Sequence, residues 1–191
     1  MRQCLLTTSA SWLWFIRNIM ENADFIKVIK DAALKAFSNL RSSHPEEDFC
    51  AFGLYSDEGA MTICPSANTT SFLEKKIKED PEDTQYYKWS TAEWKYEFSG
   101  HEWFTDVSAE ISKFHSTKHS NKDFIKFQKN LFESCVAALE QLKSENFFGN
   151  CILVFSVTGY TNNKKEISWI SRLNSPQEAS NFKKWINEQD E

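Results

Sequence analysis

The most apolar stretch of the chain is residues 151–155 (CILVF), and it limits what the chain can fold into more than any other feature. A strand that is apolar at successive positions is typically buried on both faces of its sheet. Residues 49–55 (FCAFGLY) form a second run of this kind, so both runs predict strands in the interior of a sheet. The remaining residues must supply the elements that cover this sheet.

Helical periodicity indicates where that cover comes from. Residues 24–40 and 121–145 carry apolar residues at spacings of three and four, which predicts two long helices with one buried stripe each. Residues 102–118 form a third amphipathic stretch. A short helix is expected after the cap Asn68-Thr-Thr70. A last helix is expected after Ser175-Pro-Gln-Glu178, which has the capping-box pattern with proline at the first helical position.

Turn-forming residues predict that the strands pair in two hairpins. Residues 57–60 (DEGA) are expected to turn the first strand back into residues 61–64. Residues 161–165 are expected to turn the second strand back into residues 167–173, where apolar and polar residues alternate. Hairpins followed by helices are typical of α+β domains. The predicted fold is a small antiparallel sheet built from two β-hairpins and covered by several α-helices.

The five cysteines predict a reducing environment. Their number is odd and they include no C-x-x-C pair, which fits neither a disulfide framework nor a zinc knuckle. Cys50 and Cys64 flank the first predicted hairpin. With the turn at Glu58-Gly59, Cys64 pairs with Gly53 and strand alternation sends Cys50 to the other face. We therefore expect no disulfide there and a cytoplasmic location.

A length of 191 residues suits one domain. Residues 1–19 contain a short apolar cluster that Arg17 interrupts, with no cleavage site after it, so they make a poor signal peptide. A helix signal begins at Asn22. We expect Met20 to be the natural start, residues 1–19 to be a non-native or disordered extension, and residues 20–191 to form a single α+β domain.

Charge and composition exclude several kinds of partner. The chain has 22 Lys and Arg residues against 27 Asp and Glu residues, a net charge of −5, so it does not attract phosphate backbones or anionic membranes. No apolar run reaches the roughly 18 residues needed to cross a bilayer. The chain has 5 glycines and none of the glycine-rich nucleotide motifs. We predict no cofactor, and neither nucleic acid nor a membrane as a partner.

The stretch WSTAEWKYE, which begins at Trp89, places two tryptophans in a polar part of the chain. One interpretation is the start of a helix, in which Ser90 is the N-cap and Glu93 completes a capping box. Trp89 and Trp94 then occupy the two positions of a hydrophobic staple. The other interpretation is a binding groove for a ligand or protein, lined by Trp89, Trp94 and Glu97, with at least one indole face open to solvent. The first interpretation accounts for the pattern without the second.

Few residues could support catalysis. His115 and His119 have the spacing of two zinc ligands on one helix face, but the metalloprotease pattern requires Glu where Ser116 stands. Histidine is also favoured at a helix end. Cys64 lies near a strand end without an identifiable base, and buried cysteine usually behaves as a small apolar residue. We predict no metal site and no catalytic residue.

The order of these features resembles a bacterial family, the domain-of-unknown-function 4303 family. The resemblance rests on residues 49–69, on WSTAEWKYE, and on a long helix that ends in FFG and leads into ILVFSVTGY. It covers about residue 20 to the C-terminus. The positions that match the family's pattern are Cys64-Pro65, Asn68-Thr69, Trp89 and Trp94. The resemblance implies a single α+β domain in the bacterial cytoplasm and carries over no active site.

Two classes of function remain open. The first, which we favour, is a non-catalytic binding module for another protein, for instance an immunity protein that neutralises a partner in bacterial conflict. Its support is the negative charge and the aromatic richness of the chain. The second is a hydrolase-like enzyme that uses His115, His119 or Cys64. A pocket with convergent polar groups and perturbed ionisation would favour the enzyme, and a flat acidic or aromatic face would favour the protein partner.

Overall fold

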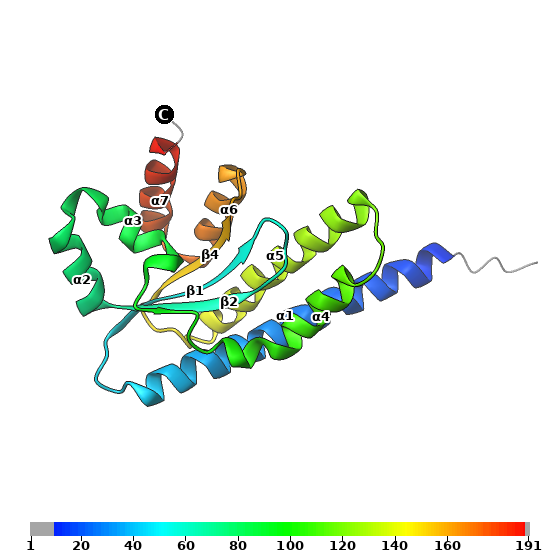
Figure 1. The fold of residues 1–191 in the computed structure, drawn as a ribbon, viewed down its shortest axis with the longest axis horizontal. Helices are drawn as coiled ribbons and strands as arrows, with labels where there is room; N and C mark the ends of the chain where they lie inside the picture. The colour runs from blue at the N-terminus through cyan, green and yellow to red at the C-terminus, as the bar shows by residue number, and fades with distance from the viewer. Residues whose placement is uncertain (1–9, 190–191) are drawn as a thin grey trace, which may run out of the picture.

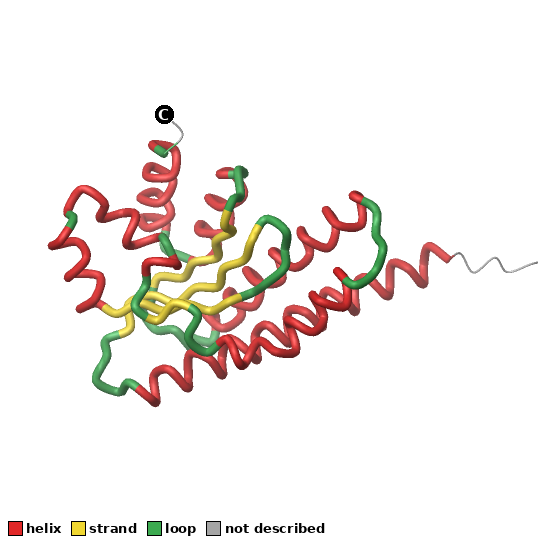
Figure 2. The backbone as a smooth tube through the Cα atoms, in the orientation of Figure 1, coloured by secondary structure: helices red, strands yellow, loops and turns green. Residues whose placement is uncertain are grey.

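The structure is a computed structural model that describes residues 10–189, with side chains from residue 23 onward. Helices lie on two sides of a central sheet (Figures 1 and 2). With η for a 3₁₀ helix, the elements in chain order are α1 (Ala10–Ser43), β1 (Phe49–Asp57), β2 (Cys64–Thr69), α2 (Thr70–Glu79), η1 (Pro81–Asp83), α3 (Thr84–Trp89), η2 (Thr91–Glu93), β3 (Tyr96–Glu97), η3 (His101–Phe104), α4 (Thr105–His115), α5 (Asn121–Ser144), β4 (Ile152–Thr158), α6 (Asn163–Leu173) and α7 (Pro176–Glu188).

The described strands form one sheet in the order β3-β2-β1-β4. β1 pairs with β2 and β2 pairs with β3 in antiparallel fashion, whereas β1 and β4 are parallel. The predicted α+β class is confirmed, but the sheet is mixed and not purely antiparallel. β1 is an interior strand, as predicted. β4 lies at the edge of the sheet, so its prediction as an interior strand is wrong.

The second predicted hairpin does not form, because residues 167–173 belong to helix α6. The Asn162 side chain accepts a hydrogen bond from the Lys165 backbone N–H at 3.2 Å and caps this helix. Residues buried at the three-and-four spacing of a helix are Trp169, Ile170 and Leu173. Seven residues fit this spacing and a strand alternation equally well, so the pattern could not decide between them. The expected turn residues are the start of a helix instead.

The first predicted hairpin forms, but its register differs from the prediction. Cys64 pairs with Tyr55 and not with Gly53. The connecting loop is longer than a two-residue turn. In this loop Ala60 adopts a positive φ of 51°, and the Asp57 carboxylate accepts hydrogen bonds from two backbone N–H groups. The described cysteines are free: Cys50, Cys64, Cys135 and Cys151.

Both faces of the sheet are buried. Helices α1, α4 and α5 lie on one side of the sheet (Figure 1). Side chains such as Phe52 of β1 and Phe155 of β4 share one core cluster with residues of these helices. On the opposite face, Ala51 and Val154 pack with Trp89 and with residues of α6 and α7. Because neighbouring residues of a strand point to opposite faces, β1 and β4 each contribute to both clusters. This explains why the two apolar runs are continuous and do not alternate.

The helices predicted in residues 24–40, 102–118 and 121–145, after Asn68-Thr-Thr70 and after Ser175 are confirmed as α1, α4, α5, α2 and α7. Helix α1 begins at Ala10, before the predicted start at Asn22, and the predicted extension is otherwise outside the described residues. Local caps agree with the sequence: Thr69 accepts a hydrogen bond from the Phe72 N–H, and Ser175 accepts one from the Glu178 N–H. None of the described helices has an apolar segment long enough to cross a lipid bilayer.

Candidate functional site

A pocket of about 330 Å³ lies beside β4, on the face of the sheet that α6 and α7 cover. We call it the β4 pocket. Four parts of the chain line it: residues 89–92, the second half of β4 with Tyr160 after it, the first turns of α6, and α7 with Gln189. Its polar residues gather where β4 ends and α6 begins. The pocket therefore includes the carboxyl end of β4, and ligand sites in sheets with parallel strands are common at that end.

Glu166 is the ionisable acid of the pocket. It lies in the first turns of α6 and is half-buried. Burial raises the pKa of its carboxyl from 4.5 to about 7, although a hydrogen bond from the Val157 backbone partly opposes the shift. Among the described residues, no charged side chain contributes to this change in pKa. The carboxyl therefore changes its charge near neutral pH.

A pair of hydroxyl groups forms a second polar element of the pocket. Thr91 Oγ1 and Ser156 Oγ lie 3.0 Å apart and share a hydrogen bond. The Thr91 carbonyl oxygen accepts a further hydrogen bond from Ser66 Oγ at 2.7 Å. These bonds hold the η2 segment against the sheet. Its close approach requires Gly53, because a Cβ there would lie 2.9 Å from Thr91 Cγ2 and 3.0 Å from the Trp94 ring.

Aromatic side chains form the apolar walls. Trp89 and Phe182 pack edge to face with ring centroids 5.1 Å apart, and Phe182 contacts Trp185 at 5.7 Å. Tyr160 stacks on Trp169, outside the lining, at 5.7 Å. Trp89 is buried, whereas Tyr160 and Trp185 are half-buried and retain surface toward solvent.

An ion pair holds the wall that contains Trp89 against α7. Lys88 Nζ donates a hydrogen bond to Glu178 Oε2 at 2.6 Å, with both side chains largely buried. Trp89 Nε1 donates to Gln85 Oε1 at 3.0 Å, which fixes the orientation of the indole. This ion pair therefore links α3, which carries Trp89, to α7 on the other side of the pocket.

The helix start predicted for WSTAEWKYE is wrong. Trp89 is the last residue of α3, and Ser90 is the C-cap of that helix, without a side-chain capping bond to η2. Trp94 has an extended backbone and follows the short η2 helix. Three residues of 3₁₀ helix fit between the two tryptophans, so the Ser-x-x-Glu spacing occurs without the α-helix that normally accompanies it.

The three predicted binding residues occupy different places. Trp89 lines the β4 pocket, whereas Trp94 lies beneath η2 against Gly53. Both indoles are buried, at 2% and 3% exposure, so the expected open indole face is wrong. Among the described atoms, Trp94 Nε1 has no hydrogen-bond partner. Glu97 lies on β3, is exposed, and accepts a hydrogen bond from the Tyr55 hydroxyl.

The polar and half-buried aromatic residues of the pocket escaped the sequence analysis: Ser156, Tyr160, Glu166 and Trp185. A usable signal was present, because Asn162 precedes Glu166 with the spacing of a helix cap followed by an acid in the first turns. The expectation of a hairpin at residues 161–173 concealed that signal.

The other catalytic candidates have local roles. His115 Nε2 lies 3.1 Å from the Ala60 carbonyl oxygen, and His119 Nδ1 lies 3.0 Å from that of Thr117. Their ring centroids are 6.0 Å apart, and the described residues contain no group of three ligating side chains. Cys64 is buried, and burial raises the pKa of its thiol. None of the three lines the β4 pocket.

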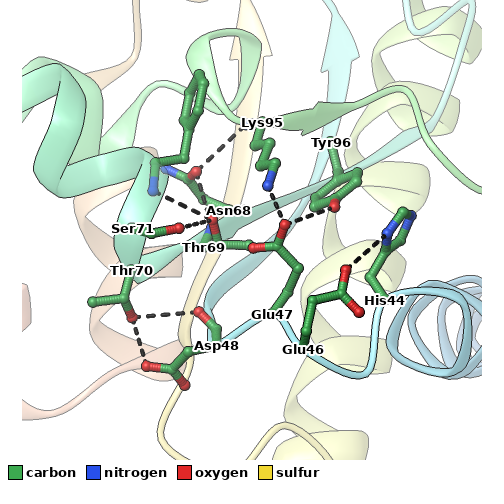
Figure 3. A network of polar contacts seen from close by, with 11 residues as sticks. His44, Glu46, Glu47, Asp48, Asn68, Thr69, Thr70, Ser71, Lys95 and Tyr96 are labelled. Carbon is green, nitrogen blue, oxygen red and sulfur yellow. Dashed lines mark hydrogen bonds and ion pairs between the residues drawn. The ribbon is translucent and has the colours of Figure 1, made fainter.

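A larger depression of about 480 Å³ lies at the end of α1 and in the loop to β1. Its acid, Glu47, is engaged in the network of Figure 3, where it accepts hydrogen bonds from Lys95 and from the Tyr96 hydroxyl. The hydrogen bond from Lys95 lowers the pKa of Glu47. The same network joins Asp48 to the Thr70 hydroxyl at 2.9 Å. Because Glu47 is paired with Lys95 and Asp48 is bonded to Thr70, both acids serve to hold the loop, and the β4 pocket is the better candidate site.

Comparison with protein families gives one match. The model described as "Domain of unknown function (DUF4303)" matches residues 29–175, which include β1, β4, η2 and all of α6. The matched range therefore contains Trp89, Glu166 and the hydroxyl pair, whereas α7 lies beyond it. No curated protein and no solved structure matches the chain.

Proposed function

The chain belongs to the DUF4303 family, and from the chemistry of the β4 pocket we propose that it is a non-catalytic binding protein. The observation that carries this proposal is a pocket with aromatic walls and a few convergent polar groups, the usual composition of a ligand site. Its volume of about 330 Å³ lies near the lower end for such sites. It suits a small molecule or a single side chain of a protein partner.

The hydrogen bonds of the pocket support binding more than reaction. A hydroxyl nucleophile requires a general base within hydrogen-bond reach. The described partner of the Ser156 hydroxyl is the Thr91 hydroxyl, and that of the Glu166 carboxyl is the Val157 backbone. We further propose that the protein works in the bacterial cytoplasm and that its ligand is another protein, as it is for an immunity protein.

A hydrolase-like enzyme is the second candidate, and Glu166 is the observation that favours it. A pKa of about 7 suits a general acid or base at physiological pH. Glu166 replaces His115, His119 and Cys64 as the residue on which this candidate depends, because those three lie outside the pocket. A pocket residue with a shifted pKa is the feature expected of an enzyme, so Glu166 gives the hydrolase candidate more support than the sequence alone did.

Retention from a cell lysate distinguishes the two candidates. Ala92 is exposed and lines the pocket, so Ala92→Phe should fill the entrance without disturbing the core. Ala109→Phe, at an exposed position of α4, is the matched control. Wild type and each variant are incubated with lysate and isolated, and mass spectrometry identifies the small molecules and proteins that remain bound.

We expect the wild type and Ala109→Phe to retain a compound or protein that Ala92→Phe does not retain, and we expect it to be chemically unchanged. Equal retention by all three proteins would contradict the proposal. A compound that the wild type converts and Ala92→Phe leaves intact would support the hydrolase candidate in its place.

A further inference from the structure

The charges around the β4 pocket specify the ligand more closely than its shape does. We infer that the pocket takes a positively charged organic group, an ammonium or guanidinium, between the Glu166 carboxylate and the half-buried aromatic side chains. This inference rests on the proposed binding function and adds the chemical class of the ligand.

The first argument is the absence of a competing cation. Among the described residues that line the pocket there is one carboxylic acid, Glu166, and no lysine, arginine or histidine. Two basic residues next to lining residues in the sequence are engaged elsewhere: Lys165 pairs with Glu133 at 3.0 Å, and Lys88 pairs with Glu178 at 2.6 Å. An anionic ligand would meet a carboxyl without a compensating charge. A cationic ligand would meet a carboxylate that no basic side chain shares.

The second argument is the aromatic lining. Organic cations are attracted to the faces of tryptophan and tyrosine rings. Trp89 already has such a contact, because Lys88 Nζ lies 5.3 Å from its ring centre, and the indole is buried. Tyr160 and Trp185 are half-buried, so these two rings retain the surface that a ligand could cover.

Proton release should accompany the binding of a cation. Burial keeps the pKa of Glu166 at about 7, and a cation beside the carboxyl favours its ionised form. The other titratable side chain of the lining is Tyr160, and burial raises its pKa further above neutrality. Asn163 and Gln189, which also line the pocket, carry no charge. Affinity for a cation should therefore increase as the pH rises through about 7.

The same chemistry could come from two sources: a free amine, or a lysine or arginine side chain of a protein partner. Calorimetric titration with three probes of similar shape tests the charge, namely benzylamine, benzyl alcohol and benzoate at pH 8. Two peptides test the source, one with a central lysine and the other with acetyl-lysine at that position. Each probe is added to wild type, Glu166→Gln, Ala92→Phe and Glu82→Gln. Glu82 is an exposed acid of η1 and does not line the pocket, so it controls for net charge.

We expect benzylamine to bind wild type and Glu82→Gln with similar affinity. Its affinity for Glu166→Gln should be lower by a factor of roughly ten or more. Ala92→Phe should not bind it. Tighter binding of the lysine peptide than of benzylamine would assign the cation to a protein partner, and the reverse would assign it to a free amine. The inference fails if no cationic probe binds, if benzyl alcohol binds as tightly as benzylamine, or if Glu166→Gln binds as the wild type does. If benzyl alcohol binds as tightly as benzylamine and Ala92→Phe abolishes that binding, the preference for a cation is refuted and the proposed binding function stands.

Discussion

Replacing Glu166 by Gln should make the protein more resistant to unfolding at alkaline pH. The carboxyl has a pKa of about 7 in the folded chain and 4.5 when it is free of the fold. Because the folded-state pKa is raised, the contribution of Glu166 to stability is fully present below pH 4.5 and is lost as the pH rises through about 7. At about 1.4 kcal/mol per unit of pKa shift, the full loss is about 3.5 kcal/mol, of which roughly 2–3 kcal/mol falls between pH 5 and pH 8. Gln keeps the shape of the protonated acid and cannot ionise.

Urea unfolding at pH 5 and pH 8 measures this effect. The difference in unfolding free energy between Glu166→Gln and wild type should increase by about 2–3 kcal/mol from pH 5 to pH 8. The acids with lowered pKa values, such as Glu133, respond at pH values below this range. Glu82→Gln serves as the exposed control and should show no such increase. An equal difference at both pH values for Glu166→Gln would refute the assignment of a buried, weakly ionised carboxyl.

Four further substitutions test other contacts in the structure. Gly53→Ala should lower stability by about 1–3 kcal/mol in thermal or urea unfolding, because the added Cβ meets Thr91 and Trp94 at about 3 Å, and a wild-type midpoint would contradict that contact. Asn174→Ala should lower the free energy of unfolding by about 1–3 kcal/mol, because the Asn174 side chain donates to the Leu153 carbonyl at 2.7 Å and accepts from the Leu153 N–H at 2.9 Å. Faster exchange of the Leu153 amide proton should accompany this loss. Ser120→Ala should cost about 0.5–2 kcal/mol through loss of the α5 capping box, whereas Ser90→Ala should leave the midpoint nearly unchanged.

The features that the sequence predicted correctly depend on neighbouring residues. Helix α5 has a regular apolar stripe, and α7 begins at Ser175 with proline after it, so both could be located from short-range pattern alone. The strand β1 was recognisable because apolar residues on both faces require cover on both faces.

The errors concern features that distant residues decide. The seven residues 167–173 have no periodicity that separates helix from strand, and the parallel pairing of β4 with β1 joins residues about one hundred positions apart. The Ser-x-x-Glu pattern at Ser90 is followed by a 3₁₀ helix that packs closely on the sheet. This close packing depends on Gly53, which is distant in the sequence and has no Cβ to meet Thr91.

The candidate site could be predicted only in part for the same reason. Trp89 was identified from its sequence context, but the pocket that it lines is assembled from four separated parts of the chain. Glu166 gains its altered pKa from burial, and burial depends on how α6 and α7 pack on β4. The chemistry of the pocket thus follows from the tertiary structure and not from a motif.

The most direct test of the account is an NMR titration of the indole N–H signals with benzylamine at pH 8. Tryptophan-to-phenylalanine variants assign the signals. If the β4 pocket binds a cationic group, the signals of Trp89 and Trp185, which line it, should shift in a saturable manner. The signal of Trp103, which is 41% exposed on η3 and lies outside the lining, should remain in place. Saturable shifts of Trp103 with unchanged signals from Trp89 and Trp185 would contradict the account.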